Sequence, residues 1–312
     1  MKPEIVVIGP MYPACAERLE REFTVHRLWE AADKTSFLQG IADRVRGVAL
    51  YALHGCPALV IEALPKLEII ASMGIGVDRI DLAAAKARGI RVTNTPDVVT
   101  DDTADIAMAL LLATERRLAE ADRFVRRGDW LKGEHPFGRA LRNRKLGIVA
   151  LGRIGQAIAK RCEAFGMEIA YYGPRRKDDI TYPYFDDPVA LAKWAEILIV
   201  AAPGGAETRN LVSRAVIDAL GPEGTLINIA RGSVVDEVAL VEALAVGRLG
   251  RAGLDVYVSE PNVPEALLAM DNVVLSPHTG SATDDTRRAM GDLTIDNLLA
   301  HFAGKPLLTP VI

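Results

Sequence analysis

The stretch KLGIVALGRIGQAIAKRCEAFG, residues 145–166, combines a short apolar run, a turn with two glycines and an amphipathic segment. This order predicts a β-strand, a tight turn and an α-helix, the unit with which a dinucleotide-binding fold begins. The turn, residues 150–155, follows the pattern G-x-G-x-x-G with Ala150 in the first place. Gly152 lets the backbone approach a pyrophosphate, and Gly155 lets the helix pack on the strand. Because a helix N-terminus stabilises phosphates, we expect cofactor contacts from Leu151, Gly152, Arg153, Ile154 and Gly155.

The next predicted strand ends in AYYGPRRK, residues 170–177, where many such sites carry an acidic residue that binds the ribose hydroxyls. Gly173 stands there instead and removes the repulsion that a carboxylate would exert on a 2′-phosphate. Arg175 and Arg176 can donate forked, charge-assisted hydrogen bonds to phosphate oxygens, and Lys177 adds a further charge. The stretch therefore predicts NADP as cofactor, with NADPH preferred over NADH. The alternative is a solvated basic loop.

Composition sets the broad class of the protein. The chain has 312 residues, of which 50% are apolar and 25% charged, and its formal net charge is -4. These values are typical of a globular protein with two domains and give no basic field for nucleic acid. The three cysteines are far apart without metal or disulfide spacing, so we expect no metal site and a reduced, cytoplasmic compartment. No apolar run is long enough to predict a membrane span.

Short apolar runs alternate with amphipathic stretches along the chain, which predicts α/β domains with parallel sheets. We expect one domain at 1–97, completed by 284–312, and a second at 98–283, with hinges near 96–100 and 284. A long helix is predicted from Thr100 to about Arg127 and a last helix over Asp284–Gly304. The predicted strands are Glu4–Ile8, Gly47–Tyr51, Leu67–Ala71 and Arg91–Thr93, then Leu146–Leu151, Glu168–Tyr172, Ile197–Ala201, Thr225–Ile229, Ala252–Asp255 and Val273–Leu275.

Three polar residues follow predicted strands of the second domain. Arg231 lies in INIARGSVVDE, Glu260 in GLDVYVSEP and His278 in VVLSPHTGSAT. Ligands of open α/β sheets bind outside the carboxyl ends of the strands, so the three can converge on one site. Taken alone, each also has a structural interpretation: Arg231 as a partner of Asp236, Glu260 as a loop carboxylate, and His278 as a packing residue.

Several ordered motifs together resemble those of the D-isomer-specific 2-hydroxyacid dehydrogenases, most closely the NADPH-linked glyoxylate/hydroxypyruvate reductases. They are GIGVDRIDLAAAKARGIRVTNTPDVVTDDTAD, GIVALGRIGQAIAKR, LINIARGSVVDE, GLDVYVSEP and LSPHTGSAT, and they extend nearly from end to end. The resemblance implies a flavodoxin-like substrate domain and a Rossmann coenzyme domain with an active-site cleft between them. It also implies a homodimer formed through the coenzyme domain.

The resemblance assigns roles to individual residues. Arg231, Glu260 and His278 are the expected catalytic residues, and Ile75 and Gly76 the backbone loop that binds the substrate carboxylate. His54 is a candidate for the substrate pocket, whereas His26, His135 and His301 are expected at the surface or in packing. Trp130 and Phe137 either approach a neighbouring subunit's site or pack in the core. Further cofactor contacts are expected from Thr103, Ala202, Pro203, Thr208, Ala230, Asp255, the partner of the nicotinamide amide, and Gly280.

The expected reaction is reduction of a small 2-oxo acid to the D-2-hydroxy acid. Arg231 can bind the carboxylate and polarise the ketone, while His278 donates the proton and Glu260 stabilises the charged imidazole. Two alternatives remain open: a reductase of bulkier aromatic acids such as hydroxyphenylpyruvate, and a nucleotide-sensing module like the family's corepressor relatives. We expect a small-molecule substrate and neither a nucleic-acid nor a membrane partner.

Overall fold

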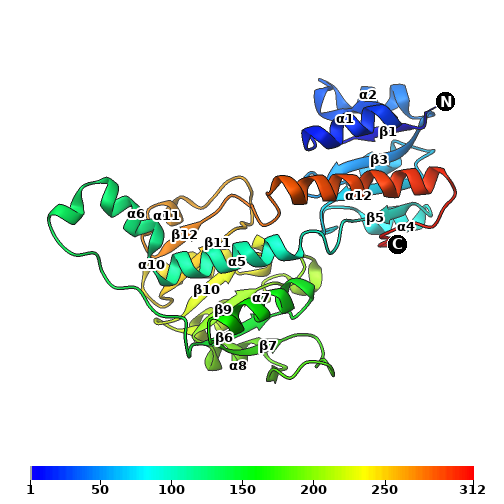
Figure 1. Ribbon diagram of the computed structural model, residues 1–312. Coiled ribbons are helices and arrows are strands. Elements are labelled where there is room, and N and C mark those ends of the chain that lie inside the picture. Colours follow the sequence, from blue (N-terminus) through cyan, green and yellow to red (C-terminus); the bar gives the residue numbers. More distant parts are fainter. Residues whose placement is uncertain (1) are drawn as a thin grey trace. The chain divides into compact units, whose positions relative to one another are not determined.

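The computed structural model describes residues 2–312 and divides into two compact units (Figure 1). The first unit contains the residues up to Val99 together with Ser281–Ile312, and the second contains Thr100–Gly280. The boundaries expected from the sequence are 97/98 and 283/284. Each unit is an α/β domain built around one parallel sheet, which confirms the predicted fold class.

The first unit has a five-stranded sheet in which every adjacent pair is parallel. Its order, β2-β1-β3-β4-β5, is that of flavodoxin-like domains. The central strands are buried on both faces and are rich in β-branched residues, as parallel strands require. The strands are β1 (Glu4–Val7), β2 (Thr24–Arg27), β3 (Val45–Tyr51), β4 (Ile69–Met73) and β5 (Arg91–Thr93).

Helices cover both faces of this sheet (Figure 1). On one face α1 (Pro13–Glu22) packs against α12 (Asp284–Phe302), which also lies over β4. Residues from the other helices form a separate apolar core on the opposite face. These helices are α2 (Lys34–Ile41), α3 (Ala58–Glu62) and α4 (Leu82–Ala87).

The C-terminal tail extends the first sheet on its β5 side. Thr93 forms an antiparallel bridge with Pro310, and the amide of Val311 donates to the carbonyl of Val92 at 2.7 Å. Asn297 of α12 is fully buried and accepts the amide of Thr309 at 3.2 Å. In turn, the hydroxyl of Thr309 donates to the carbonyl of Asn94 at 2.6 Å. A buried asparagine therefore connects the tail to the segment that follows β5.

The second unit has a seven-stranded parallel sheet of order β12-β11-β10-β9-β6-β7-β8. The strand order reverses between β6 and β9, so the topological switch point lies there, as in a Rossmann fold. Alternate residues of β9 point to different cores, Leu198 and Val200 to one and Ile197 and Ile199 to the other. The strands are β6 (Lys145–Val149), β7 (Glu168–Tyr172), β8 (Tyr184–Phe185), β9 (Ile197–Val200), β10 (Thr225–Asn228), β11 (Arg251–Leu254) and β12 (Val273–Leu275).

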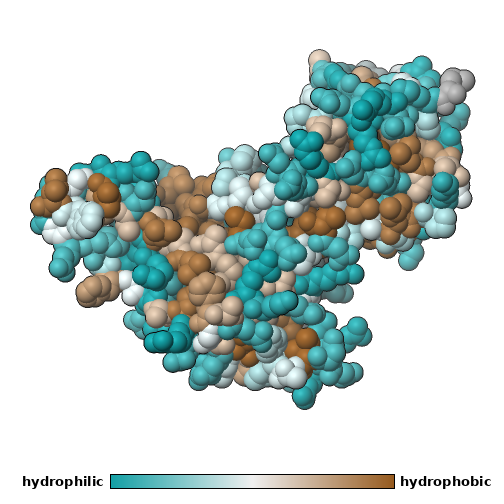
Figure 2. Space-filling view, viewed as in Figure 1, coloured by the Kyte–Doolittle hydropathy of each residue, from teal (hydrophilic) through white to brown (hydrophobic). Residues whose placement is uncertain are grey.

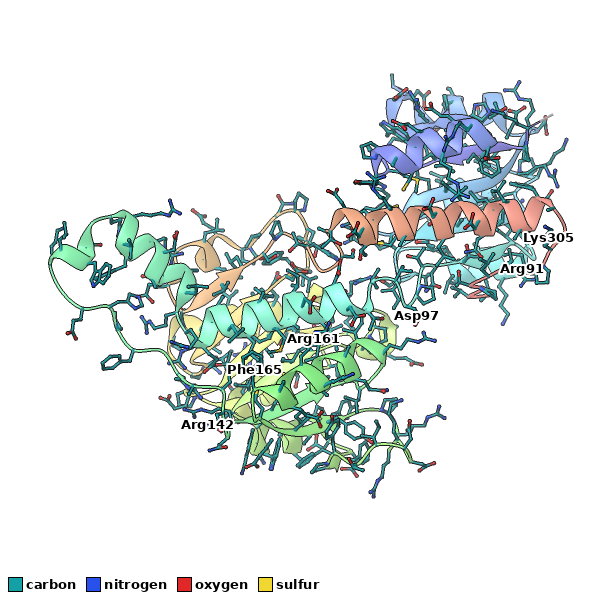
Figure 3. The ribbon with its side chains drawn as sticks, in the orientation of Figure 1. Arg91, Asp97, Arg142, Arg161, Phe165 and Lys305 are labelled. Atoms are coloured by element: carbon teal, nitrogen blue, oxygen red, sulfur yellow. The ribbon has the colours of Figure 1, made fainter. Side chains whose placement is uncertain are left out.

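Two helices cover one face of this sheet, α5 (Thr100–Glu115) and α7 (Arg153–Ala164), and they lie side by side (Figure 1). Arg161 of α7 is drawn beneath α5 in Figure 3, and its guanidinium pairs with Asp105 at 2.7 Å and Asp101 at 3.0 Å. The opposite face and its margin carry α8 (Pro188–Trp194), α9 (Arg214–Leu220), α10 (Glu237–Ala245) and the short α11 (Glu265–Leu268).

Three elements differ from the prediction. The edge strands β2 and β8 are not among the predicted strands, because their residues are half-exposed and lack a continuous apolar run. The predicted long helix is two helices, because α5 ends at Glu115 and α6 (Leu118–Arg126) follows after a left-handed Arg117 with φ 53°. No residue of α6 is buried, so packing on the sheet does not continue beyond α5. Within residues 2–312, no helix has the length and apolar character to cross a membrane.

Candidate active site

The glycine turn lies at the switch point of the second sheet, between β6 and α7. Gly155 is buried, and a Cβ atom there would lie 2.5 Å from the carbonyl oxygen of Ala150, so only glycine fits. Gly152 is exposed, and a Cβ atom there would meet nothing within 4 Å. The fold itself thus requires glycine at position 155. At position 152, only a bound group lying against the backbone would require it.

Ala150 occupies the position where this pattern usually has glycine. Its φ is 74°, in the left-handed region, and its amide donates to the carbonyl of Tyr172 at 2.9 Å. A left-handed alanine costs roughly 1–2 kcal/mol. The turn therefore keeps the glycine conformation in spite of the side chain.

The basic loop, residues 173–177, follows β7. Gly173 is buried, whereas Arg175 and Arg176 are exposed. Neither arginine forms an ion pair with any residue in the described range 2–312. These two guanidinium groups, without an acidic partner in that range, are thus available to an anion. Position 173 carries no acidic side chain that would repel it.

The remaining predicted cofactor positions lie in the same unit, after strands or, for Thr103, in helix α5. Ala202 is buried after β9, and the hydroxyl of Thr208 closes the following loop by donating to the carbonyl of Pro203 at 2.6 Å. Thr103, in the first turn of α5, donates to the carbonyl of Gly280 at 3.1 Å. The structure therefore brings Thr103 and Gly280 together.

The Arg231 loop follows β10 and is fixed by a buried asparagine. Asn228 accepts the amide of Ala230 at 3.1 Å and donates to the carbonyl of Arg231 at 3.0 Å. Gly232 leaves no room for a side chain, because a Cβ atom would lie 2.0 Å from the backbone carbon of Tyr257. The loops after β10 and β11 are consequently in direct backbone contact next to Arg231.

Asp255, at the end of β11, fixes the loop that carries His278. Its carboxylate is 1% exposed and accepts the amides of Thr279 at 2.8 Å and Gly280 at 2.9 Å. Its carbonyl also accepts the amide of His278 at 2.8 Å. Nearby, burial raises the pKa of Tyr257 to about 12, and its hydroxyl donates to the carbonyl of Ser276 at 3.0 Å. Asp255 thus supports the loop, while its predicted role toward a nicotinamide stays a prediction.

His278 and Glu260 form a side-chain pair. Nδ1 of His278 lies 3.0 Å from each carboxylate oxygen of Glu260, and one of these oxygens also accepts the amide of Tyr257 at 3.1 Å. The two side chains are 20% and 13% exposed. His278 has φ 55°, a left-handed conformation that is uncommon outside glycine. The imidazole is held by a carboxylate through Nδ1, which leaves Nε2 to exchange a proton with a substrate.

In the first unit the predicted carboxylate loop, Ile75 and Gly76, follows β4. The side chain of Asn94 donates to the carbonyl of Ile75 at 2.8 Å, and buried Thr95 accepts the amide of Gly74 at 2.9 Å. Within residues 2–312, neither Ile75 nor Gly76 donates its amide to another group. Two adjacent amides of a fixed loop are therefore available to a carboxylate.

His54 lies at the same edge of the first sheet, after β3. Its ring lies over Gly9, where a Cβ atom would be 2.4 Å from the imidazole, and contacts Tyr51 edge-on at 5.9 Å. Burial and, to a smaller extent, Arg79 lower the pKa of His54. Of the other histidines, His26 pairs with Glu4 at 2.7 Å and His301 with Glu68 at 3.0 Å. His135 contacts Phe124 edge-on at 5.3 Å.

Sequence reasoning missed the residues that fix the site loops. Asn228 lies within the apolar run TLINIA, and a lone polar residue there is the signal that could have identified it. Asn94 and Thr95 lie in TNTP, directly after a strand. Within residues 2–312, no three His, Cys, Asp or Glu side chains form a group that could hold a metal ion.

The second sheet, with its glycine turn at the switch point, defines a dinucleotide-binding α/β protein. Residues 108–280 match the family D-isomer specific 2-hydroxyacid dehydrogenase, NAD binding domain, and the chain belongs to this family of oxidoreductases. It is 49% identical to glyoxylate/hydroxypyruvate reductase A of Arabidopsis thaliana, and the match covers 99% of this chain and 98% of the relative.

Two further relatives match over nearly their whole length. The hydroxyphenylpyruvate reductase of Plectranthus scutellarioides is 47% identical, over 99% of this chain and 98% of the relative. The NADPH-dependent glyoxylate/hydroxypyruvate reductase of Sinorhizobium meliloti was solved in complex with NADP and malonate. It matches with a TM-score of 0.94 and 46% identity, over 100% of this chain and 97% of the other. The chain is thus similar to reductases of both small and aromatic oxo acids.

The Asp255 carboxylate provides a test of the site's architecture. Asp255→Asn should destabilise the second unit by about 1–3 kcal/mol, because an amide NH₂ would face a backbone N–H that now donates to a carboxylate oxygen. Urea unfolding followed by tryptophan fluorescence measures the change. Asp178→Asn is the matched control, because Asp178 is exposed in a loop. Equal midpoints for the two variants would contradict the anchoring role.

Proposed function

We propose that the chain reduces a small 2-oxo acid of the glyoxylate or hydroxypyruvate type to the D-2-hydroxy acid, using NADPH. The observation that carries the proposal is the imidazole of His278 held by Glu260 through Nδ1. This pair lies on loops that pack against the Arg231 loop through Gly232 and Tyr257. A cytoplasmic location stays a prediction.

His278 is proposed as the general acid. As a carbonyl is reduced, negative charge develops on its oxygen, and a proton from Nε2 of the imidazolium neutralises it. Glu260 accepts from Nδ1 in the meantime, so it orients the ring and stabilises its positive charge. In the direction of oxidation, the neutral imidazole takes the proton back.

Arg231 is proposed to bind the substrate carboxylate and the carbonyl oxygen with its forked guanidinium. In the first unit, the adjacent amides of Ile75 and Gly76 are proposed to bind a carboxylate. Both loops are fixed by buried polar side chains, Asn228 for the first and Thr95 for the second. Fixed donors cost little reorganisation when charge develops, which is what an oxyanion site requires.

The residues at the glycine turn fit a dinucleotide. Open space at Gly152 and the N-terminus of α7 fit a pyrophosphate. Arg175 and Arg176, which have no ion-pair partner within residues 2–312, fit a 2′-phosphate. When bound, the dihydronicotinamide supplies the hydride that the carbonyl carbon takes up. The NADP complex of the Sinorhizobium meliloti relative supports this choice of cofactor.

A bulkier aromatic oxo acid is the second candidate substrate. The 47% identity to the hydroxyphenylpyruvate reductase of Plectranthus scutellarioides favours it, and His54 and Tyr51 are aromatic groups at the edge of the first sheet. Comparing kcat/KM for glyoxylate, hydroxypyruvate and hydroxyphenylpyruvate decides between the two classes. A preference for the aromatic acid would replace the substrate proposed first.

His278→Gln should lower kcat by about 10²–10⁴-fold, because the variant has no group that can transfer the proton. The measurement is the steady-state rate of NADPH oxidation with glyoxylate, and the folded state is checked by circular dichroism. His301→Gln is the matched control, since His301 also pairs with a glutamate at 3.0 Å. Near-normal turnover of His278→Gln would refute the catalytic assignment.

Cofactor preference is tested at the basic loop. The double variant Arg175→Ala/Arg176→Ala should weaken NADPH binding by tenfold or more, because each charge-assisted hydrogen bond contributes roughly 1.5–3 kcal/mol. NADH binding should change little. Titration of nicotinamide fluorescence gives both dissociation constants without turnover. Arg214→Ala/Arg248→Ala removes the same charge at ion-paired arginines of the same unit and serves as the control. Equal losses for NADPH and NADH would disprove the assignment.

We further propose a homodimer that uses the arm, defined as residues 118–139. Several of its apolar residues are exposed, with Leu131 94%, Phe137 92% and Trp130 70% accessible. Figure 2 shows apolar side chains on the part of the second unit that contains the arm. The alternative that Trp130 and Phe137 pack in the core of their own chain is wrong. Exposed apolar groups of this size on one segment are typical of a protein–protein interface.

Leu131→Glu/Phe137→Glu should convert a dimer into a monomer at micromolar concentration, because charges would be buried in the interface. Sedimentation equilibrium measures the mass. Val238→Glu/Leu268→Glu adds the same charges at exposed apolar positions outside the arm and should leave the mass unchanged. The proposal fails if the unmodified chain is monomeric or if the arm variant remains dimeric.

A further inference from the structure

The basic loop, residues 173–177, is fixed at both of its ends by tyrosine hydroxyls. The hydroxyl of Tyr184 donates to the carbonyl of Gly173 at 3.0 Å, and the hydroxyl of Tyr171 accepts the amide of Lys177 at 2.8 Å. The first and last residues of the loop are thus each bonded to a side chain of an adjacent strand.

The two tyrosines themselves are held by the sheet. They are direct partners in the parallel pairing of β7 with β8, and their rings are 5.3 Å apart. Tyr171 is 1% exposed, so its ring cannot move without disturbing the apolar core beneath α5 and α7. Pro174 restricts the backbone between the two attachment points. The loop is therefore fixed by sheet residues, although the side chains of Arg175 and Arg176 are exposed.

Fixing both ends of the loop affects how tightly the loop can bind an anion. Arg175 and Arg176 are exposed and lack ion-pair partners within residues 2–312, so their side chains lose conformational entropy when they bind a phosphate. If the loop backbone also had to become ordered on binding, the entropy cost would be larger. Fixing the backbone beforehand removes that part of the cost and strengthens binding.

We infer that Tyr171 and Tyr184 are positioning residues that determine how tightly the basic loop binds the 2′-phosphate of the cofactor. Neither tyrosine needs to touch the phosphate. Both act through the backbone at Gly173 and Lys177, and so they set the selectivity for NADPH over NADH rather than the affinity for dinucleotides in general. The inference rests on the proposed function only in taking Arg175 and Arg176 as the phosphate ligands.

The test compares binding of adenosine 2′,5′-bisphosphate with binding of 5′-AMP by isothermal titration calorimetry, together with NADPH and NADH fluorescence titrations. Tyr184→Phe and Tyr171→Phe should each weaken the 2′-phosphorylated ligands by about three- to tenfold, the effect of losing one hydrogen bond. Binding of 5′-AMP and NADH should change less than about twofold.

Tyr182→Phe is the matched control. Tyr182 lies in the same segment, but its hydroxyl donates to Glu163 at 2.8 Å and not to the basic loop. This variant should keep the selectivity of the unmodified chain. In the Arg175→Ala/Arg176→Ala background, the tyrosine substitutions should cause no further loss, because the groups that they position are absent.

The possible outcomes separate this inference from the proposed function. If the arginine variant loses 2′-phosphate binding but Tyr171→Phe and Tyr184→Phe do not, the positioning role is overturned and the proposed cofactor preference stands. Equal weakening of 5′-AMP, or an equal effect of Tyr182→Phe, also overturns the positioning role, because it indicates a general structural effect. If the arginine variant binds adenosine 2′,5′-bisphosphate normally, both proposals fail.

Discussion

The buried carboxylate of Asp255 is the interaction on which the candidate site depends. A charge that is 1% exposed must be compensated, and here the compensation comes from backbone amides of Thr279 and Gly280. These bonds close the loop after β12 onto the end of β11 and hold His278 in its left-handed conformation. With that backbone fixed, the imidazole contacts Glu260 through Nδ1. The proton transfer proposed for His278 would therefore depend on a residue that need not touch the substrate.

Much of the fold follows from the sequence, because buried parallel strands are short apolar runs between glycine or polar turns. Arg91–Thr93, Glu168–Tyr172 and Val273–Leu275 are strands with the predicted bounds. The glycine turn can likewise be identified from the sequence, because only glycine fits at position 155. For the site, the His278–Glu260 contact agrees with the expected convergence of strand ends. Their catalytic roles stay a proposal.

Other features of the structure have no periodic pattern of apolar residues from which they could be predicted. The edge strands β2 and β8 are held by pairing with their neighbours more than by burial, so their residues look like loop. The division between α5 and α6 arises where contact with the sheet ends, which a helical pattern cannot show. Asn94 and the hydroxyl of Tyr184 act on backbone atoms that are 19 and 11 positions away in the chain. Such bonds depend on the tertiary fold and cannot be assigned before it is known.

The first unit is made from both ends of the chain, whereas the second is a single continuous segment. During synthesis on the ribosome, all residues of the second unit are made before those of α12 and the tail that follows it. The nucleotide-binding half can consequently fold first, as continuous domains generally do. The first sheet is extended by Pro310 and Val311, and Asn94 receives its bond from Thr309, only after the second unit has been made. Residues made after the second unit thus complete the support of a loop encoded more than two hundred positions earlier.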